Sequence, residues 1–132
     1  MNSIRAAAGL ALLALAGCGE SAPPPPTATA LSIDDFRREL VNMPLCGKPT
    51  TGPVASKTMC TVHASDGTAT LAGPGLVARG VWDTDGRSVC RRDVTEAVTQ
   101  RRCVTYEKLS DGRYRNSDGV EFCLGPCPDS PK

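Results

Sequence analysis

Alternating apolar and polar positions characterise the second half of the chain. In the segment 76–82, Leu76, Ala78 and Trp82 fall on one face of an extended backbone and Arg79 falls on the other. This period of two predicts a strand with one buried face. Short β-prone runs predict further strands at 58–64, 68–72, 87–91, 102–108, 113–115 and 120–123.

Turn signals separate many of these runs. Four Asp-Gly pairs, in which glycine supplies a positive φ at no steric cost, stand at Asp66-Gly67, Asp85-Gly86, Asp111-Gly112 and Asp118-Gly119. Runs joined by tight turns pair as antiparallel neighbours. The sequence therefore predicts a mainly β (α+β) fold, a small antiparallel meander or open barrel.

One segment, 32–40, has the pattern of a helix. Ile33, Phe36 and Leu40 share a face, Ser32 can cap the start, and two aspartates occupy the first turn, where the helix dipole favours anions. Pro44 prevents continuation. We expect this one N-terminal helix to pack against the sheet.

The first twenty residues differ from the rest. Arg5 precedes an apolar stretch, 6–16, which is shorter than the roughly 20 residues of a membrane span and typical of a signal peptide. It ends in Leu15-Ala16-Gly17-Cys18, which resembles the lipobox of bacterial lipoproteins. The resemblance implies removal of residues 1–17 and acylation of Cys18, and each buried CH₂ of the acyl chains contributes about 0.8 kcal/mol to anchoring. The alternative is an ordinary secretory signal peptide whose cleavage site happens to contain a cysteine.

Residues 18–30 have the composition of a lipidated tether. They contain four consecutive prolines, 23–26, and no large apolar side chain, so we expect an extended polyproline II segment. The lipoprotein resemblance also implies outer-membrane localisation facing the periplasm, because Gly19 rather than Asp follows Cys18. The globular domain is then expected at 31–132.

With Cys18 assigned to lipid, six of the seven cysteines remain. An even number in an exported domain predicts three disulfides, for which fifteen connectivities exist. The flanking strand-like runs favour Cys90 with Cys103, and short spacing suggests Cys46 with Cys60 and Cys123 with Cys127. The chain has no C-x-x-C motif and one histidine, so neither metal binding nor a cofactor is expected.

The charges are nearly balanced, with 15 Lys+Arg against 14 Asp+Glu. This balance argues against a nucleic-acid binder that works by releasing counterions. Four arginines flank the connection between the third and fourth domain cysteines, at positions Arg91, Arg92, Arg101 and Arg102. They suggest an anion-binding patch for a lipid, a glycan or an envelope protein. The alternative is a solvated strand edge whose charges prevent aggregation.

The one histidine, His63, is the candidate for catalysis. Ser65 lies two residues away, on the same face of an extended segment, but no nucleophile motif surrounds the pair. An exposed histidine on a strand is the alternative. Asp83 and Asp85 are close enough to suggest an acid pair, although their position beside a turn also explains them.

A Gly80-x-Trp82 strand, a turn, Cys90 and then Cys103 before an aromatic strand resemble a layout of small exported bacterial β domains of unknown function. This resemblance implies a fold and no activity. We therefore expect a membrane-anchored envelope lipoprotein with a non-catalytic binding or scaffold domain. The alternatives are an inhibitor of a cell-wall hydrolase, a small hydrolase using His63, and a purely structural role.

Overall fold

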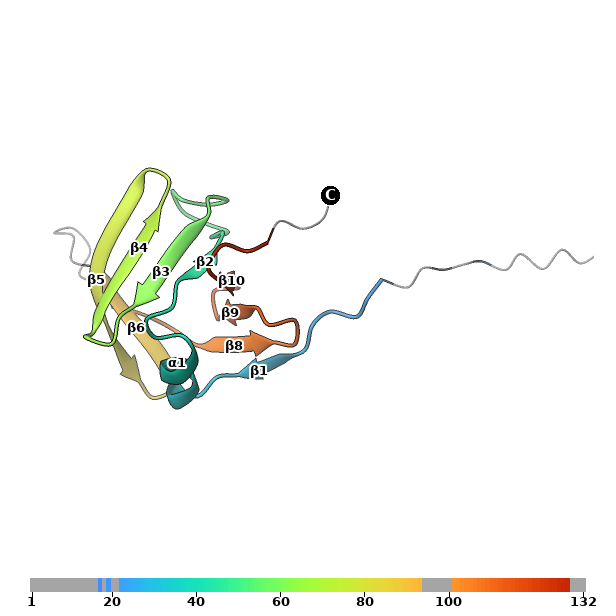
Figure 1. Ribbon diagram of the computed structural model, residues 1–132, viewed down its shortest axis with the longest axis horizontal. Helices are drawn as coiled ribbons and strands as arrows, with labels where there is room; N and C mark the ends of the chain where they lie inside the picture. Colours follow the sequence, from blue (N-terminus) through green and yellow to red (C-terminus); the bar gives the residue numbers. More distant parts are fainter. Residues whose placement is uncertain (1–16, 18, 20–21, 94–100, 129–132) are drawn as a thin grey trace, which may run out of the picture.

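The computed structural model describes residues 17, 19, 22–93 and 101–128. Its strands form one antiparallel sheet in the order β1-β8-β9-β10-β2-β3-β4-β5-β6-β7 (Figure 1), which confirms the predicted fold class. The elements are β1 (Ala28–Ala30), α1 (Ile33–Glu39), β2 (Leu45–Gly47), β3 (Met59–His63), β4 (Thr68–Gly73), β5 (Leu76–Asp85), β6 (Ser88–Asp93), β7 (Arg102–Val104), β8 (Tyr106–Leu109), β9 (Tyr114–Asn116) and β10 (Glu121–Leu124).

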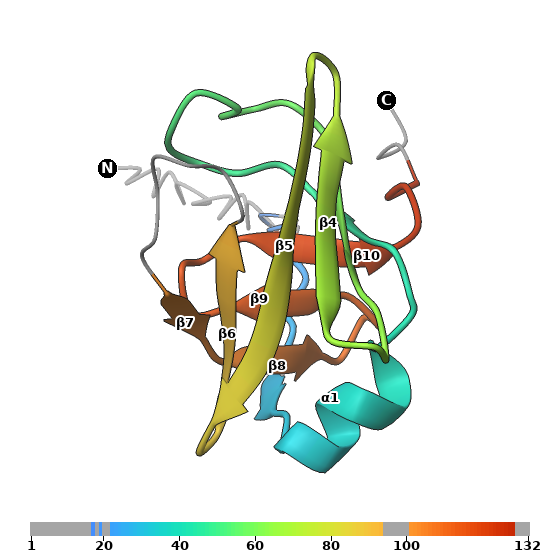
Figure 2. The same ribbon diagram turned by 90° about the vertical axis from the view of Figure 1, so that its left-hand side faces the viewer.

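The sheet curls back on itself. Strand β7 stands at one end of the strand order, and β8 stands second from the opposite end. In the chain, however, only Thr105 separates these two strands. In Figure 2, β4, β5 and β6 cross in front of β8, β9 and β10. The curled sheet therefore encloses the apolar side chains that alternate along its strands.

Helix α1 lies across one end of the curled sheet (Figures 1 and 2). It begins as predicted, because Ser32 and Asp35 form a capping box in which each side chain bonds the backbone of the other residue. Phe36 and the C-cap residue Leu40 are fully buried. They join a core whose other members are Leu31, Leu45, Val89, Tyr106 and Tyr114.

The predicted turns are confirmed at all four Asp-Gly pairs. Their glycines have φ values between 59° and 89°. All four turns join antiparallel neighbours, connecting β3 to β4, β5 to β6, β8 to β9 and β9 to β10.

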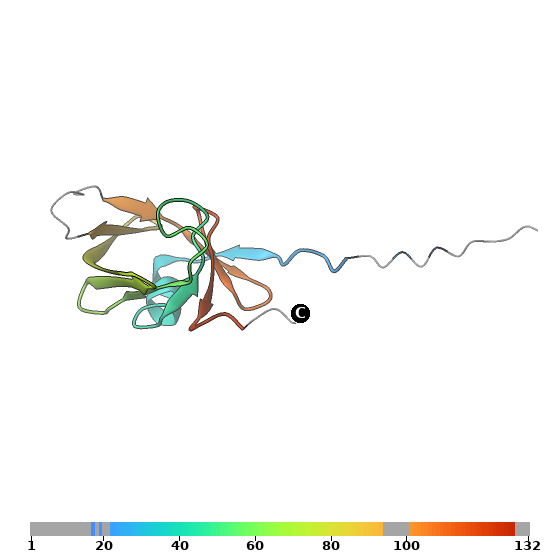
Figure 3. The ribbon, with the colours of Figure 1, turned by 90° about the horizontal axis from the view of Figure 1, so that it is seen from above.

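Three features of the strands differ from the sequence-based expectation. Strand β1 lies inside the predicted tether and pairs with β8, so the folded part begins at Ala28 rather than Leu31. Strand β2 was not predicted, and the run 102–108 is divided at Thr105 into β7 and β8. Both missed strands have three residues, too few to show a period of two. Figure 3 shows residues 22–27 leading away from the domain beyond β1.

Three disulfides tie the sheet, and they join the pairs that the sequence favoured. Cys46–Cys60 links β2 to β3, and Cys90–Cys103 links β6 to β7. Each of these pairs stands at directly opposed positions of neighbouring strands. Cys123–Cys127 ties β10 to the segment that follows it.

Candidate functional site

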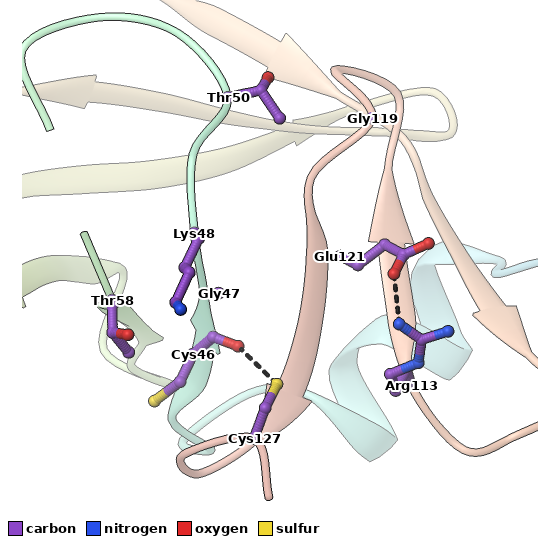
Figure 4. Close-up of a pocket in the computed structure, with 9 residues that line it drawn as sticks. All are labelled: Cys46, Gly47, Lys48, Thr50, Thr58, Arg113, Gly119, Glu121 and Cys127. Carbon is purple, nitrogen blue, oxygen red and sulfur yellow. Dashed lines mark hydrogen bonds and ion pairs between the residues drawn. The ribbon is translucent and has the colours of Figure 1, made fainter. Parts of the chain in front are cut away.

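A pocket of about 350 Å³ opens on the outer side of the sheet around β2 and β10 (Figure 4). Its volume falls in the range of small-ligand sites, about 300–1,000 Å³. It is lined by Cys46, Gly47, Lys48, Thr50, Thr58, Arg113, Gly119, Glu121 and Cys127. These residues come from four separate parts of the chain.

Close pairing of β2 with β10 shapes the pocket. A Cβ atom added at Gly47 would lie 2.3 Å from the Glu121 carbonyl oxygen, so no larger residue fits there without displacing a strand. Cys46 on β2 is bonded to Cys60 on β3, and the Cys127 Sγ lies 3.6 Å from the Cys46 carbonyl oxygen. Two disulfides therefore brace the pocket.

The charged side chains of the pocket differ in how they are paired. The Arg113 guanidinium binds Glu121 and lies 2.7 Å from an Asp111 carboxylate oxygen. These acids raise the pKa of Arg113 above its usual value, chiefly through the Asp111 hydrogen bond. Lys48 is exposed and has no ion-pair partner within the described parts of the chain.

This arrangement suits an anionic group. Figure 4 shows Lys48 on one side of the pocket and the Arg113–Glu121 pair on the other. Thr50 and Thr58 add hydroxyl groups to the lining. A carboxylate that enters would meet Lys48, a cation with no acid partner in the described parts of the chain, and hydroxyl donors of the lining.

The four arginines of the predicted anion-binding patch do not share a face. Arg91 stands directly opposite Arg102 in the β6–β7 pairing. Side chains alternate between the two sides of a strand, so Arg92 projects from the opposite side to Arg91. Arg92 and Arg101 line a separate hollow of about 50 Å³ beside Trp82.

Carboxylates also neutralise most of these arginines. Arg91 binds Asp93, Arg102 binds Asp118, and Arg101 binds both Asp83 and Asp85. The hydrogen bond that Arg101 donates to Asp83 is the main cause that raises the pKa of Arg101. A single concentrated cationic surface is therefore not formed. Asp83 and Asp85 hold an arginine, and this contact explains their proximity without an acid pair for catalysis.

His63 is buried rather than exposed, with 3% of its surface accessible. Its ring packs edge-on against Phe36, Trp82 and Tyr106, with centroid distances between 5.3 and 6.5 Å. The Nδ1 atom has no hydrogen-bond partner among the described residues. Burial is the main cause that lowers the pKa of His63 to about 4, and the positive charge of Arg91 lowers it further.

The geometry that a hydrolase would need at His63 is not built by the described residues. A general base needs a nucleophile and an orienting group within hydrogen-bond reach. Ser65 offers its backbone N–H to the Asn42 side chain, and no hydrogen bond joins Ser65 to His63. The aromatic surroundings of His63 indicate a packing role.

Cys18, the predicted lipidation site, lies outside the described residues. No helix in the described parts of the chain is long and apolar enough to cross a membrane. Within the same residues, no cluster of three or more His, Cys, Asp or Glu side chains is arranged to hold a metal ion.

Sequence reasoning missed the pocket residues Lys48, Arg113 and Glu121. They are far apart in the chain and belong to no motif, and β2, which carries the first of them to the site, is too short to be predicted. The one sequence signal for the pocket was the set of six cysteines in the domain, because two of their disulfides border the pocket.

Comparison with known proteins adds no assignment. The chain matches no family model, no curated protein and no solved structure.

Proposed function

We propose that the chain is a lipid-anchored protein of the bacterial envelope whose β domain is a non-catalytic binding or scaffold domain. The lipobox-like segment ending at Cys18 supports the anchor. Three disulfides fit an oxidising compartment outside the cytosol. The six residues 22–27, which precede β1, would span about 19 Å at 3.1 Å per residue in a polyproline II conformation.

The pocket around β2 and β10 is the observation that carries the binding role. It is concave, braced by covalent bonds, and lined by a small number of charged and polar groups, which is typical of a preformed binding site. Among the described residues, Lys48 is the pocket cation that has no acid partner. We therefore propose that the pocket takes up an acidic group of an envelope partner.

Photo-crosslinking in intact cells tests this proposal. A photoreactive amino acid placed at Thr50, which lines the pocket, should give a discrete crosslinked product. The same amino acid at Val77, which is 68% exposed and lies outside the pocket, should not give that product.

A lysine pair supplies the matched control. Lys48→Met should reduce the Thr50 crosslink severalfold, because the partner's acidic group loses its cation. Lys57→Met removes an exposed lysine that does not line the pocket and should leave the crosslink unchanged. Equal products from positions 50 and 77, or no effect of Lys48→Met, would reject the pocket as the binding site.

A further inference from the structure

Two of the three disulfides are neighbours in the sheet. Cys46 on β2 stands directly opposite Cys60 on one side and directly opposite Cys123 on the other. Opposed residues of antiparallel strands project from the same face with Cα atoms typically about 4.5–5.5 Å apart, which lies within the usual range of disulfide bonds, about 4.4–6.8 Å. The Cα atoms of the bonded pair Cys46–Cys60 are closer, at 4.0 Å. Cys46 therefore has two cysteine neighbours placed for bonding, although it is bonded to Cys60.

Cys127 is the most accessible cysteine of the cluster. It is exposed and bonded to Cys123, Cys60 is half-buried, and Cys123 and Cys46 are buried, with 8% and 1% of their surfaces accessible. Both Cys127 and Cys46 line the pocket, as Figure 4 shows. An external thiol that enters the pocket therefore reaches the Cys127 sulfur first.

We propose that this pocket is a thiol–disulfide exchange site that accepts a thiolate at Cys127 and passes the exchange on to Cys46. In the first step the external thiolate attacks the Cys127 Sγ, a mixed disulfide forms, and the Cys123 thiolate leaves. In the second step the Cys123 thiolate attacks the Cys46 Sγ, the Cys46–Cys123 bond forms, and the Cys60 thiolate leaves and takes a proton from water. The number of disulfides is conserved, and the one co-reactant is the external thiol.

The charges of the pocket favour this reaction. The incoming nucleophile is a thiolate, which nearby cations stabilise. Lys48 and Arg113 line the same pocket as Cys46 and Cys127. An anionic thiol suits the site for the same reason.

The Cys90–Cys103 disulfide provides an internal comparison. Cys103 is exposed, as Cys127 is, so an external thiol can reach it. The residue opposite Cys90 on its other side is Asp83, not a cysteine. Attack at Cys103 therefore releases a thiolate at Cys90 that has no second disulfide beside it, and the exchange stops there.

Limited reaction of the oxidised full-length protein with reduced glutathione tests the proposal. The reaction is run without oxygen and quenched with acid, free thiols are alkylated, and the peptides are mapped by mass spectrometry without reduction. We expect glutathione on Cys127, a Cys46–Cys123 link and the alkyl label on Cys60. Label confined to Cys123 with Cys46–Cys60 intact would overturn the relay.

Two matched variants test the second step without glutathione. In Cys127→Ser the unpaired Cys123 should exchange with its neighbour, so the alkyl label should divide between Cys123 and Cys60. In Cys103→Ser the label should stay on Cys90. Label only on Cys123 in the first variant would contradict the proposal, and the wild-type mapping decides the question if either variant fails to fold.

The rate of the first step tests the role of charge. Lys48→Gln should slow the reaction with glutathione severalfold, whereas Lys57→Gln should leave the rate unchanged. Equal rates would remove the pocket cation from the mechanism. The peptide map is independent of the crosslinking result, so failure of this exchange and failure of the proposed binding role are distinguishable.

Discussion

Burial of His63 makes the stability of the domain depend on pH, and the sign follows from the direction of its pKa shift. The pKa is 6.5 for an ordinary histidine and about 4 for His63 in the folded protein. Between about pH 6.5 and pH 4, His63 therefore binds a proton in the unfolded chain but not in the folded chain. The free energy of unfolding should fall as the pH drops below 6.5 and should stop falling, for this group, below about pH 4.

The size of the effect follows from the same two values. A shift of this extent, at about 1.36 kcal/mol per pKa unit, corresponds to roughly 3 kcal/mol in total. About 2 kcal/mol of that should be lost between pH 7.5 and pH 5, because the folded form is still almost unprotonated there. The deep burial of the ring, with 3% of its surface accessible, justifies the conversion without a large discount for solvent.

The range between pH 7.5 and pH 5 isolates the effect of His63, because it is the one histidine in the chain. Asp35, Glu39, Asp66 and Asp111 have pKa values lowered below 3.8 or 4.5 by hydrogen bonds, so their titration lies in more acidic solution. Among the described residues, Arg91 is the charged group that affects the pKa of His63.

Urea unfolding at pH 7.5, 6 and 5 measures the effect, with fluorescence of the single tryptophan as the signal. Trp82 is well placed, since its ring centroid lies 5.7 Å from that of His63. His63→Leu places an apolar, non-titrating side chain of similar size at this position. The free energy of unfolding of this variant should show almost no pH dependence in this range. If the variant loses stability as steeply as the wild type, or if NMR titration places the pKa of His63 near 6.5, the reasoning is refuted.

Three further substitutions test other parts of the account. Cys18→Ser should move the protein from the membrane fraction to the soluble fraction, and unchanged fractionation would contradict lipid anchoring. Ser32→Ala should lower the free energy of unfolding by about 1 kcal/mol in urea titration, because it removes the helix cap; a loss below a few tenths would show that the cap is unimportant. Gly80→Ala should lower the free energy of unfolding by about 1–3 kcal/mol in the same assay, because the added Cβ would lie 2.4 Å from the Arg92 carbonyl oxygen. An unchanged free energy of unfolding would show that β5 and β6 separate easily.

Local chemistry in the sequence was enough to predict much of the fold. The Ser32 cap, the Asp-Gly turns and the alternation around Trp82 each act within a few residues, and the structure confirms them. The flanking strand-like runs likewise favoured Cys90 with Cys103, and these two cysteines stand directly opposite each other on β6 and β7. Strands of three residues left no such pattern, and β1 pairs through its backbone with all three of its residues exposed.

The candidate site was much less predictable, because it depends on which face each side chain occupies and on contacts between distant segments. Arg91 and Arg92 are adjacent in the chain but lie on opposite sides of β6. The sequence favoured an exposed His63. In the structure, α1 and the curled sheet bury it against Phe36 and Tyr106. The pocket joins Lys48 to Glu121 through the pairing of β2 with β10, which no local pattern reveals.

We propose that the seven cysteines are divided between one lipid anchor and three disulfides. Intact-mass spectrometry of the protein extracted from membranes, before and after reduction and alkylation, measures that division. We predict a chain that begins at Cys18, carries a diacylglycerol increment, and gains six alkyl groups only after reduction. A chain without lipid, or one that is alkylated at several of the other cysteines before reduction, would contradict the account.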